Sequence, residues 1–230
     1  MAFNFSPKVV TEGLVLYLDA ANTKSYVSGS TTWNDISRTG ANGTLINGPT
    51  FNSGNGGSIV FDGVDDYCNL PSSLPRLYGT FTISLWVNPA RISIPTTSQS
   101  LITTDWSVGF LNYMIYQTND KFNTVIGNGT SSDPIMTSNT TLIANTWYNL
   151  VLVCNGTSHI MYINGNSDVI QNGAYSGVLT SNVRNLATDN VGSVGYFFQG
   201  NISNTLWYNR ALTAQEIQQN YNATRTRYGL

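Results

Sequence analysis

Hydrophobic and polar residues alternate along most of this chain, which is the pattern of β-strands that turn one face toward a core. In the clearest case, residues 80–87, every second residue from Phe81 to Val87 is large and apolar. Pro89 is expected to end this strand, because proline has no N–H to donate to a neighbouring strand. Residues 13–20 alternate in the same way and predict a half-buried strand. Further strands are expected at residues 58–61, 67–70, 100–103, 112–117, 121–126, 147–154, 159–163, 190–195 and 201–208.

Short turns rich in glycine and asparagine separate these strands. Asn155-Gly156 is expected to join two strands as a hairpin, and Asn164-Gly165 to follow the second of them with another turn. Asp62-Gly63 is expected to form a tight hairpin between residues 58–61 and 67–70. Glycine suits such turns because it adopts a positive φ without steric cost.

One helix is expected, near the C-terminus, over residues 213–221. Thr213 is placed to cap it, and Glu216 three residues later is placed to return the hydrogen bond, while Leu212 and Ile217 form the apolar pair that brackets such a cap. Many short strands closed by one helix predict an all-β fold, a two-sheet antiparallel jelly-roll sandwich. No repeat or linker divides the chain, so we expect a single domain over residues 1–230 with short arms at both ends.

Six short motifs carry a resemblance to a known family. They are Leu16-Tyr17-Leu18-Asp19-Ala20; Phe61-Asp62-Gly63 with Asp65-Asp66-Tyr67; Thr82-Ile83-Ser84-Leu85-Trp86-Val87; Trp147-Tyr148-Asn149-Leu150-Val151; Met161-Tyr162-Ile163-Asn164-Gly165; and Asn209-Arg210-Ala211-Leu212-Thr213 with Glu216-Ile217. In this order they resemble laminin-G-like domains of the concanavalin A-like lectin/glucanase superfamily, over roughly residues 13–228. The resemblance implies the sandwich fold. It says less about function, because this fold hosts lectins, glycosidases, adhesins and structural modules.

The composition limits the classes of partner. Charged residues make up 10% of the chain and the net charge is −2, whereas roughly 25% charged residues is usual in globular proteins. Such a surface does not attract nucleic acid or anionic lipid. No apolar run approaches the roughly 18 residues of a membrane span. We therefore expect no nucleic-acid or membrane partner, and recognition through neutral hydrogen bonds and aromatic contacts.

The N-terminus and the two cysteines bear on where the protein is made. The first eight residues lack a basic start followed by an apolar stretch, so we expect no signal peptide and synthesis in a cytoplasm. Cys68 and Cys154 both lie in strand-like runs. Two reduced thiols in the core are the favoured interpretation, and a single disulfide is the alternative.

The acidic residues give little support to catalysis. Glycoside hydrolysis needs two carboxyl groups about 5 to 9.5 Å apart, yet the chain has only two glutamates, Glu12 and Glu216, and the helix cap uses the second. Asp105 and Asp120 are isolated in loops. The Glu-x-Asp-x-x-Glu motif of glucanases in the resembled superfamily is absent. His159 is the only histidine and is expected to lie on a sheet face or rim. We expect no enzyme and no catalytic residues; a degenerate glycosidase using Asp105 or Asp120 is a minor alternative.

Three carboxylates, those of Asp62, Asp65 and Asp66, lie within five residues at one predicted turn. Such a group suits calcium, which prefers oxygen ligands, and the resemblance implies that these positions could supply them at a sheet rim. The alternative is that Asp62 makes the turn while the other two bond loop amides. We favour the alternative and expect that no cofactor is required.

Aromatic side chains in loops are the candidates for ligand recognition. Sugars stack on tryptophan or tyrosine rings while amide and hydroxyl groups bond their hydroxyls. Trp106 and Tyr113 are the ligand-binding candidates that we single out.

The resemblance, the neutral surface and the missing signal peptide together favour a bacteriophage virion protein. We expect a non-enzymatic head decoration protein or fibre-type adhesin, located in the virion after synthesis in the host cytoplasm. Its expected partners are further copies of itself in a homo-oligomer such as a trimer, and other virion proteins, with cell-surface glycans as a further class. The alternative function is a carbohydrate-binding lectin module that recognises bacterial surface glycans.

Overall fold

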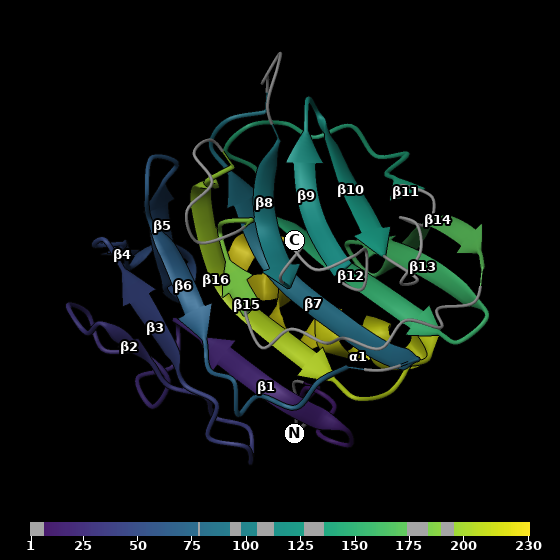
Figure 1. Cartoon of the computed structure of the whole chain (residues 1–230), viewed down its shortest axis with the longest axis horizontal. Helices are drawn as coiled ribbons and strands as arrows, with labels where there is room; N and C mark the ends of the chain where they lie inside the picture. Colours follow the sequence, from purple (N-terminus) through teal and green to yellow (C-terminus); the bar gives the residue numbers. More distant parts are fainter. Residues whose placement is uncertain are drawn as a thin grey trace, which may run out of the picture.

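The computed structural model describes residues 7–77, 79–92, 98–104, 113–126, 136–173, 184–189 and 196–230. Over these residues the chain forms two stacked antiparallel sheets and a C-terminal helix, which confirms the predicted fold class (Figure 1). Sheet A contains β1 (Leu14–Asp19), β4 (Thr50–Asn52), β5 (Ser58–Asp62), β7 (Thr80–Pro89), β12 (Tyr148–Asn155), β13 (Ser158–Ile163), β14 (Asn166–Asn172) and β16 (Gln199–Tyr208). Sheet B contains β2 (Thr32–Trp33), β3 (Gly43–Ile46), β6 (Tyr67–Leu70), β8 (Gln99–Thr104), β9 (Tyr113–Thr118), β10 (Lys121–Ile126), β11 (Met136–Thr137) and β15 (Arg184–Leu186). The helical segments are η1 (Gly54–Gly56), α1 (Ala214–Thr224) and η2 (Arg225–Tyr228).

The core lies between the two sheets. Sheet A has the order β14-β13-β12-β7-β16-β5-β4, with β1 also paired to β16, and sheet B has the order β11-β10-β9-β8-β15-β6-β3-β2. One continuous cluster of buried apolar side chains fills the space between them. Strand β7 contributes alternate residues from Phe81 to Val87, all fully buried in this cluster, as its pattern predicts.

The hairpins predicted around asparagine and glycine are confirmed in sheet A. Strand β12 pairs with β13, and β13 pairs with β14, both antiparallel. The second turn uses Asn164 and Gly165, with φ of 51° and 78°. A Cβ atom at Gly165 would lie 3.0 Å from the Tyr221 ring, so glycine also allows the turn to approach α1 closely.

The predicted hairpin between residues 58–61 and 67–70 is wrong. Strand β5 pairs with β4 and β16 in sheet A, whereas β6 pairs with β3 and β15 in sheet B. The turn at Asp62-Gly63 therefore belongs to an arch that carries the chain from one sheet to the other. Phe61 and Cys68 are both buried in the core cluster, one from each sheet. An arch buries these alternating side chains as well as a hairpin does. The alternation of apolar and polar residues therefore does not distinguish an arch from a hairpin.

The strand predicted over residues 13–20 is confirmed as β1, but it is not half-buried, because residues on both of its faces are buried and its outer edge is covered. Leu16 faces the core, and Asp19 is fully buried as well. At the edge away from β16, Asp35 Oδ1 accepts a hydrogen bond from Tyr17 N (2.8 Å), and Ile36 N donates to Tyr17 O (2.9 Å). Thr39 Oγ1 donates to Val15 O, and Asp19 N donates to Ser25 Oγ. This loop closes the edge of the strand without being a strand itself.

The predicted helix cap is confirmed. Helix α1 begins at Ala214, Thr213 accepts a hydrogen bond from Glu216 N, and the Glu216 carboxylate accepts one from Thr213 N at 2.9 Å. Arg210 also donates to the same carboxylate. Its hydrogen bonds, followed by those of Thr213, lower the pKa of Glu216 to about 2, although burial opposes them. This carboxylate is held at the helix terminus as an anion.

The C-terminal segment covers the outer face of sheet A through aromatic contacts. The Trp86 ring, on the side of β7 away from the core, stacks on Tyr228 with ring centres 3.9 Å apart and on Tyr221 at 5.8 Å. Trp86 Nε1 donates to Thr224 Oγ1 at 2.8 Å. The ion pair between Arg227 and Asp19, at 2.9 Å, ties η2 to the end of β1. Trp86 therefore anchors both α1 and η2 to the central strand.

Several other predictions can be compared with the described residues. Cys68 and Cys154 are both free and buried, which confirms the reduced thiols, and burial raises the pKa of Cys68 to about 12. No helix in the described part of the chain is long and apolar enough to cross a membrane. The strand predicted at residues 190–195 lies outside the described residues. The single domain over residues 1–230 stays a prediction.

Truncating Tyr228 tests whether aromatic stacking holds the C-terminal segment. Tyr228→Ala is expected to lower the free energy of unfolding by about 3–5 kcal/mol, since it removes a buried ring from Trp86. Tyr228→Phe keeps the ring and loses the hydroxyl, which donates to Ser203 Oγ at 2.8 Å and accepts from Asn204 Nδ2 at 3.5 Å, so about 1 kcal/mol is expected. Urea denaturation of both variants measures the difference. Equal losses would show that the hydroxyl, and not the ring, fixes the segment.

Candidate functional site

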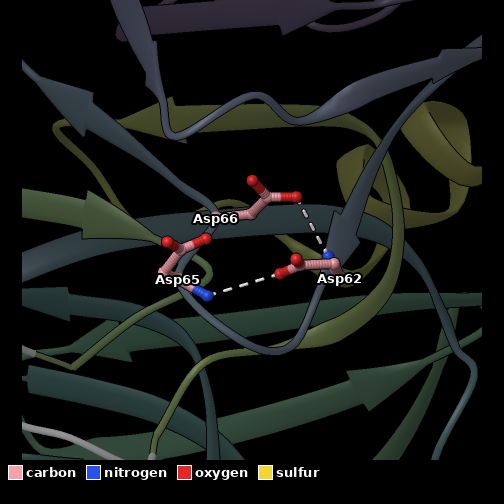
Figure 2. A group of neighbouring side chains, drawn as sticks. All are labelled: Asp62, Asp65 and Asp66. Carbon is pink, nitrogen blue, oxygen red and sulfur yellow. Dashed lines mark hydrogen bonds between the residues drawn. The ribbon is translucent and has the colours of Figure 1, made fainter.

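The acidic loop (residues 62–66) connects β5 in sheet A to β6 in sheet B. One carboxylate oxygen from each of Asp62, Asp65 and Asp66 lies within 4.8 Å of the other two (Figure 2). Asp62 Oδ1 accepts hydrogen bonds from Val64 N (2.8 Å) and Asp65 N (3.4 Å), while Asp66 Oδ2 accepts one from Asp62 N (3.1 Å). The structure therefore brings the three predicted carboxylates together, and two of them also form the turn.

Asp66 differs from its two neighbours in being buried. The pKa of Asp66 is raised to about 6, mainly because burial desolvates the carboxylate and also because the charges of Asp62 and Asp65 lie nearby, although the hydrogen bond from Asp62 N opposes the shift. A carboxyl group with this pKa is partly protonated in mildly acidic solution. A cation placed among the three side chains would reverse this effect, because it would favour the ionised forms.

The donor set fits calcium only in part. Calcium takes about six to eight oxygen ligands, and the loop brings three carboxylates together, of which Asp62 and Asp66 already accept backbone hydrogen bonds. If a cation binds, Asp62, Asp65 and Asp66 would hold it, and it would join the two sheets at their connection. The turn-forming interpretation accounts for the observed bonds without a cation.

A groove lies beside this loop, between the edge strands of the two sheets. It has a volume of about 410 Å³, and we call it the edge groove. It is lined by Tyr26, Ser28, Gly29, Ser30, Thr31, Leu45, Asn47, Gly48, Pro49, Thr50 and Phe51. These residues flank β2 and β3 of sheet B and β4 of sheet A.

Apolar side chains form the inner wall of the edge groove and polar groups form its rim. Tyr26 and Leu45 are buried in the core cluster, and the Phe51 ring is half-buried, 5.5 Å from the ring of Tyr26. Ser28, Thr31 and Thr50 on the rim are exposed. None of the described residues that line the groove is charged. This combination suits a ligand with one apolar face and several hydroxyl groups.

Asn47 connects the edge groove to the acidic loop. It lines the groove, and its Nδ2 donates to Asp65 O at 2.8 Å. Its φ of 66° is in the left-handed region, which asparagine tolerates better than most residues. Changes in the acidic loop can therefore reach the rim of the groove through a single hydrogen bond.

A second groove lies beside β1 and, unlike the edge groove, is lined by charged residues. Its volume is about 500 Å³, and residues 11–14 and 36–38 line it. Glu12 and Arg38, both exposed, bring opposite charges to this groove. It is therefore less suited than the edge groove to an uncharged ligand.

The other residues singled out from the sequence either lie outside the described residues or are not among those that line the two grooves. Trp106 and Asp105 lie outside the described residues. Tyr113 is the first residue of β9, and its side chain is also outside the described part. Asp120 lies in the turn between β9 and β10, and His159 is buried in β13. The expectation of no enzyme stays a prediction.

The sequence interpretation missed the edge groove. Tyr26 and Phe51 are 25 residues apart in the chain, and neither was singled out. The one available signal was Asn47-Gly48-Pro49, a strong turn sequence after a short apolar run. It could have placed a turn there, but not the groove that the turn borders.

Comparison with family models identifies the fold family. The model described as the concanavalin A-like lectin/glucanases superfamily matches residues 62–218, which is more than half of the chain. The chain belongs to this family, as its motifs indicated. A comparison with curated proteins found no match.

Solved structures share the fold at low sequence identity. Domain 4 of AbnA, a GH43 extracellular arabinanase from Geobacillus stearothermophilus solved with arabinotriose, has a TM-score of 0.69 and 16% identity, covering 92% of this chain and 100% of that one. The binding domain of botulinum neurotoxin DC in complex with SialylT has a TM-score of 0.74 and 12% identity, covering 94% of this chain and 52% of that one. A Trypanosoma rangeli sialidase mutant displaying trans-sialidase activity has a TM-score of 0.69 and 16% identity, covering 95% of this chain and 34% of that one.

These similarities establish the fold alone. The chain spans all of the arabinanase domain, about half of the toxin binding domain and about a third of the sialidase.

The raised pKa of Asp66 predicts a pH-dependent stability. Its folded pKa of about 6 lies above the ordinary value of 3.8, so the folded protein binds more protons than the unfolded chain between these values. Its contribution to stability is full below about pH 4 and is lost as the pH rises through about 6. Asp66→Asn, which keeps an acceptor for Asp62 N, is expected to flatten the stability profile between pH 4.5 and 7. Urea denaturation across this range measures it.

Asp120→Asn is the control for this profile, because Asp120 lies in a turn of sheet B outside the acidic loop. It should keep the slope of the wild-type protein. A slope that survives in Asp66→Asn would mean that other groups set the pH dependence.

Calcium binding at the acidic loop is a separate test. We expect no heat when millimolar calcium is titrated into the protein, and no change of melting temperature in chelator, because Asp62 and Asp66 already serve the turn. A binding isotherm that disappears in Asp65→Asn, whose side chain is exposed, would instead establish a calcium site.

Proposed function

We propose that this protein is a non-catalytic carbohydrate-binding module and that the edge groove holds a neutral sugar. The observation that carries the proposal is the chemistry of this groove. An aromatic ring, Phe51, is half-buried beside a rim of hydroxyl and amide groups, with no charge among the described lining residues. Sugars bind to such surfaces through ring stacking and through hydrogen bonds to their hydroxyls.

The family and the structural neighbours support the same class of ligand. The arabinanase domain, which this chain covers completely, was solved with a bound trisaccharide. The weakly charged surface of this chain agrees with a neutral ligand, for which binding depends little on salt.

Glycan binding therefore takes precedence over the virion function expected from the sequence. Nothing in the fold or the comparisons favours a virion setting, a homo-oligomer or other virion partners. Those expectations, and the expected location, stay predictions. Glycan recognition is compatible with them, since a virion adhesin could also bind cell-surface sugars.

Binding measurements on groove variants test the proposal. The probes are neutral oligosaccharides, including arabinotriose, titrated by calorimetry or NMR. Phe51→Leu keeps apolar volume but removes the ring face, and the double variant Ser28→Ala, Thr31→Val removes two exposed hydroxyls. Each is expected to weaken binding by about tenfold, equivalent to roughly 1.4 kcal/mol.

Arg38→Ala, in the groove beside β1, is the matched control and should leave sugar binding unchanged. The proposal fails if the wild-type protein binds no sugar of the panel. It also fails if Arg38→Ala weakens binding as much as the edge-groove variants do.

A further inference from the structure

Asparagine is followed by glycine at many turns of this chain. These pairs begin at Asn42, Asn47, Asn55, Asn128, Asn155, Asn164 and Asn172. Such a pair can modify itself, because the glycine nitrogen can attack the side-chain amide carbon of the asparagine and glycine has no Cβ to hinder the approach. The pair at Asn128 lies outside the described residues. In the other pairs, hydrogen bonds decide how freely the reacting groups can meet.

Asn155, the last residue of β12, has a side-chain oxygen on which several donors converge. Its Oδ1 accepts hydrogen bonds from Thr157 N (3.0 Å), Ser158 N (2.8 Å) and Thr157 Oγ1 (3.0 Å). Both donor residues belong to the same turn as Asn155, and the Asn155 side chain is exposed. Donors placed in this way favour attack on the carbonyl carbon, because they stabilise the negative charge that develops on the oxygen.

The leaving group and the attacking nitrogen of this pair are both available. Within the described part of the chain, every hydrogen bond of the Asn155 side chain is made by Oδ1, so Nδ2 can leave without breaking one. Gly156 N donates to no oxygen of the described residues, and its N–H lies against the Cys154 thiol. Sulfur is a weak acceptor, so this contact holds the nitrogen only weakly.

The other described pairs are restrained by bonds to more distant parts of the chain. In four of them the asparagine side chain bonds another element: Asn42 Oδ1 accepts from Asp35 N, Asn47 Nδ2 donates to Asp65 O, Asn55 Nδ2 donates to Arg227 O, and Asn164 Oδ1 accepts from Asn149 N. In the pair at Asn172, Gly173 N already donates to Thr157 O at 3.0 Å. Reaction at these pairs would break such a bond, at a cost of roughly 0.5–1.5 kcal/mol each.

We infer that Asn155-Gly156 is a self-modification site, at which the asparagine converts to aspartate and isoaspartate without another protein. Gly156 N loses its proton and forms a bond to Asn155 Cγ, and the bond between Cγ and Nδ2 breaks. Nδ2 leaves as ammonia and takes up the proton. A water molecule from the solvent then opens the cyclic imide at one of its two carbonyl groups, and the choice of carbonyl gives aspartate or isoaspartate.

Either product changes the chemistry of the hairpin between β12 and β13. It places a carboxylate at a turn that is neutral in the unmodified chain, of which charged residues make up only 10%. Isoaspartate also lengthens the backbone of the turn by one atom, next to the register pair of Cys154 and His159. The modification is independent of the proposed sugar binding, since neither Asn155 nor Gly156 lines the edge groove.

Peptide mass spectrometry of the intact protein after incubation in mildly alkaline buffer tests the inference. Asn42-Gly43-Thr44 is a matched internal control, because it repeats the three residues of Asn155-Gly156-Thr157. In the folded protein, Asn155 is expected to react at least about tenfold faster than Asn42, a difference of roughly 1.4 kcal/mol in barrier. In guanidinium chloride, where the turns are lost, the two rates are expected to converge.

Thr157→Val tests the role of the converging donors, because it removes Oγ1 and keeps Thr157 N. It is expected to slow the reaction at Asn155 roughly threefold in the folded protein, since water replaces part of the effect of an exposed hydroxyl. The rate in guanidinium chloride should not change. Thr44→Val is the matched control: Thr44 is also exposed and follows an Asn-Gly pair, but its hydroxyl makes no hydrogen bond to Asn42 in the structure. It should leave the rate at Asn155 unchanged.

Three outcomes would overturn the inference. An unmodified Asn155 in the folded protein after Asn42 has reacted would remove the site. Equal rates at Asn42 and Asn155 in the folded protein would mean that the dipeptide alone, and not the turn, sets the reaction. An unchanged or faster reaction in Thr157→Val would mean that the donors restrain the side chain and do not activate it.

Discussion

The alternation of side chains along each strand determines both faces of each sheet at once. Because inward residues such as Ile83 and Ile102 must fill the space between the sheets, their neighbours along the strand are forced outward. In sheet A the outward row includes Trp86, which α1 and η2 cover. In sheet B the outward row is polar and neutral where Asn69 and Asn185 meet. The packing of the core therefore decides which side chains face outward, and the two outer faces differ in their chemistry.

Sequence predicts the local features of this fold well, since each depends on residues close together in the chain. The hairpin at Asn164-Gly165 and the cap between Thr213 and Glu216 are examples, and both are confirmed. The path from β5 to β6 was predicted wrongly, because Phe61 and Cys68 reach the same core from one sheet or from two. The alternation of apolar and polar residues along a strand predicts which residues are buried, but it does not predict which strand pairs with it. Partners such as β16 and β5 are set by packing across the whole molecule.

The candidate sites also differ in whether their residues are close together or far apart in the sequence. The carboxylates of the acidic loop could be predicted because Asp62, Asp65 and Asp66 are adjacent in sequence. The edge groove could not, since it joins segments that are distant in the chain, from Tyr26 to Phe51. Trp106 was chosen by residue type alone. Residue type shows which side chains can stack on a sugar, whereas strand register shows which polar groups lie together and which of them lack partners.

The covered edge of β1 has a consequence for how copies of this chain could associate. An open edge strand offers unpaired N–H and C=O groups to any extended segment, and sheets can grow from it between molecules. Here Asp35 and Thr39 already use the groups of Tyr17 and Val15 that face outward. Because the bonding groups come from side chains and one short loop, they offer no continuous ladder to an incoming strand. Intermolecular extension of sheet A is therefore blocked beside β1, and any such growth would begin at β4 or β14, the strands at the two ends of the sheet.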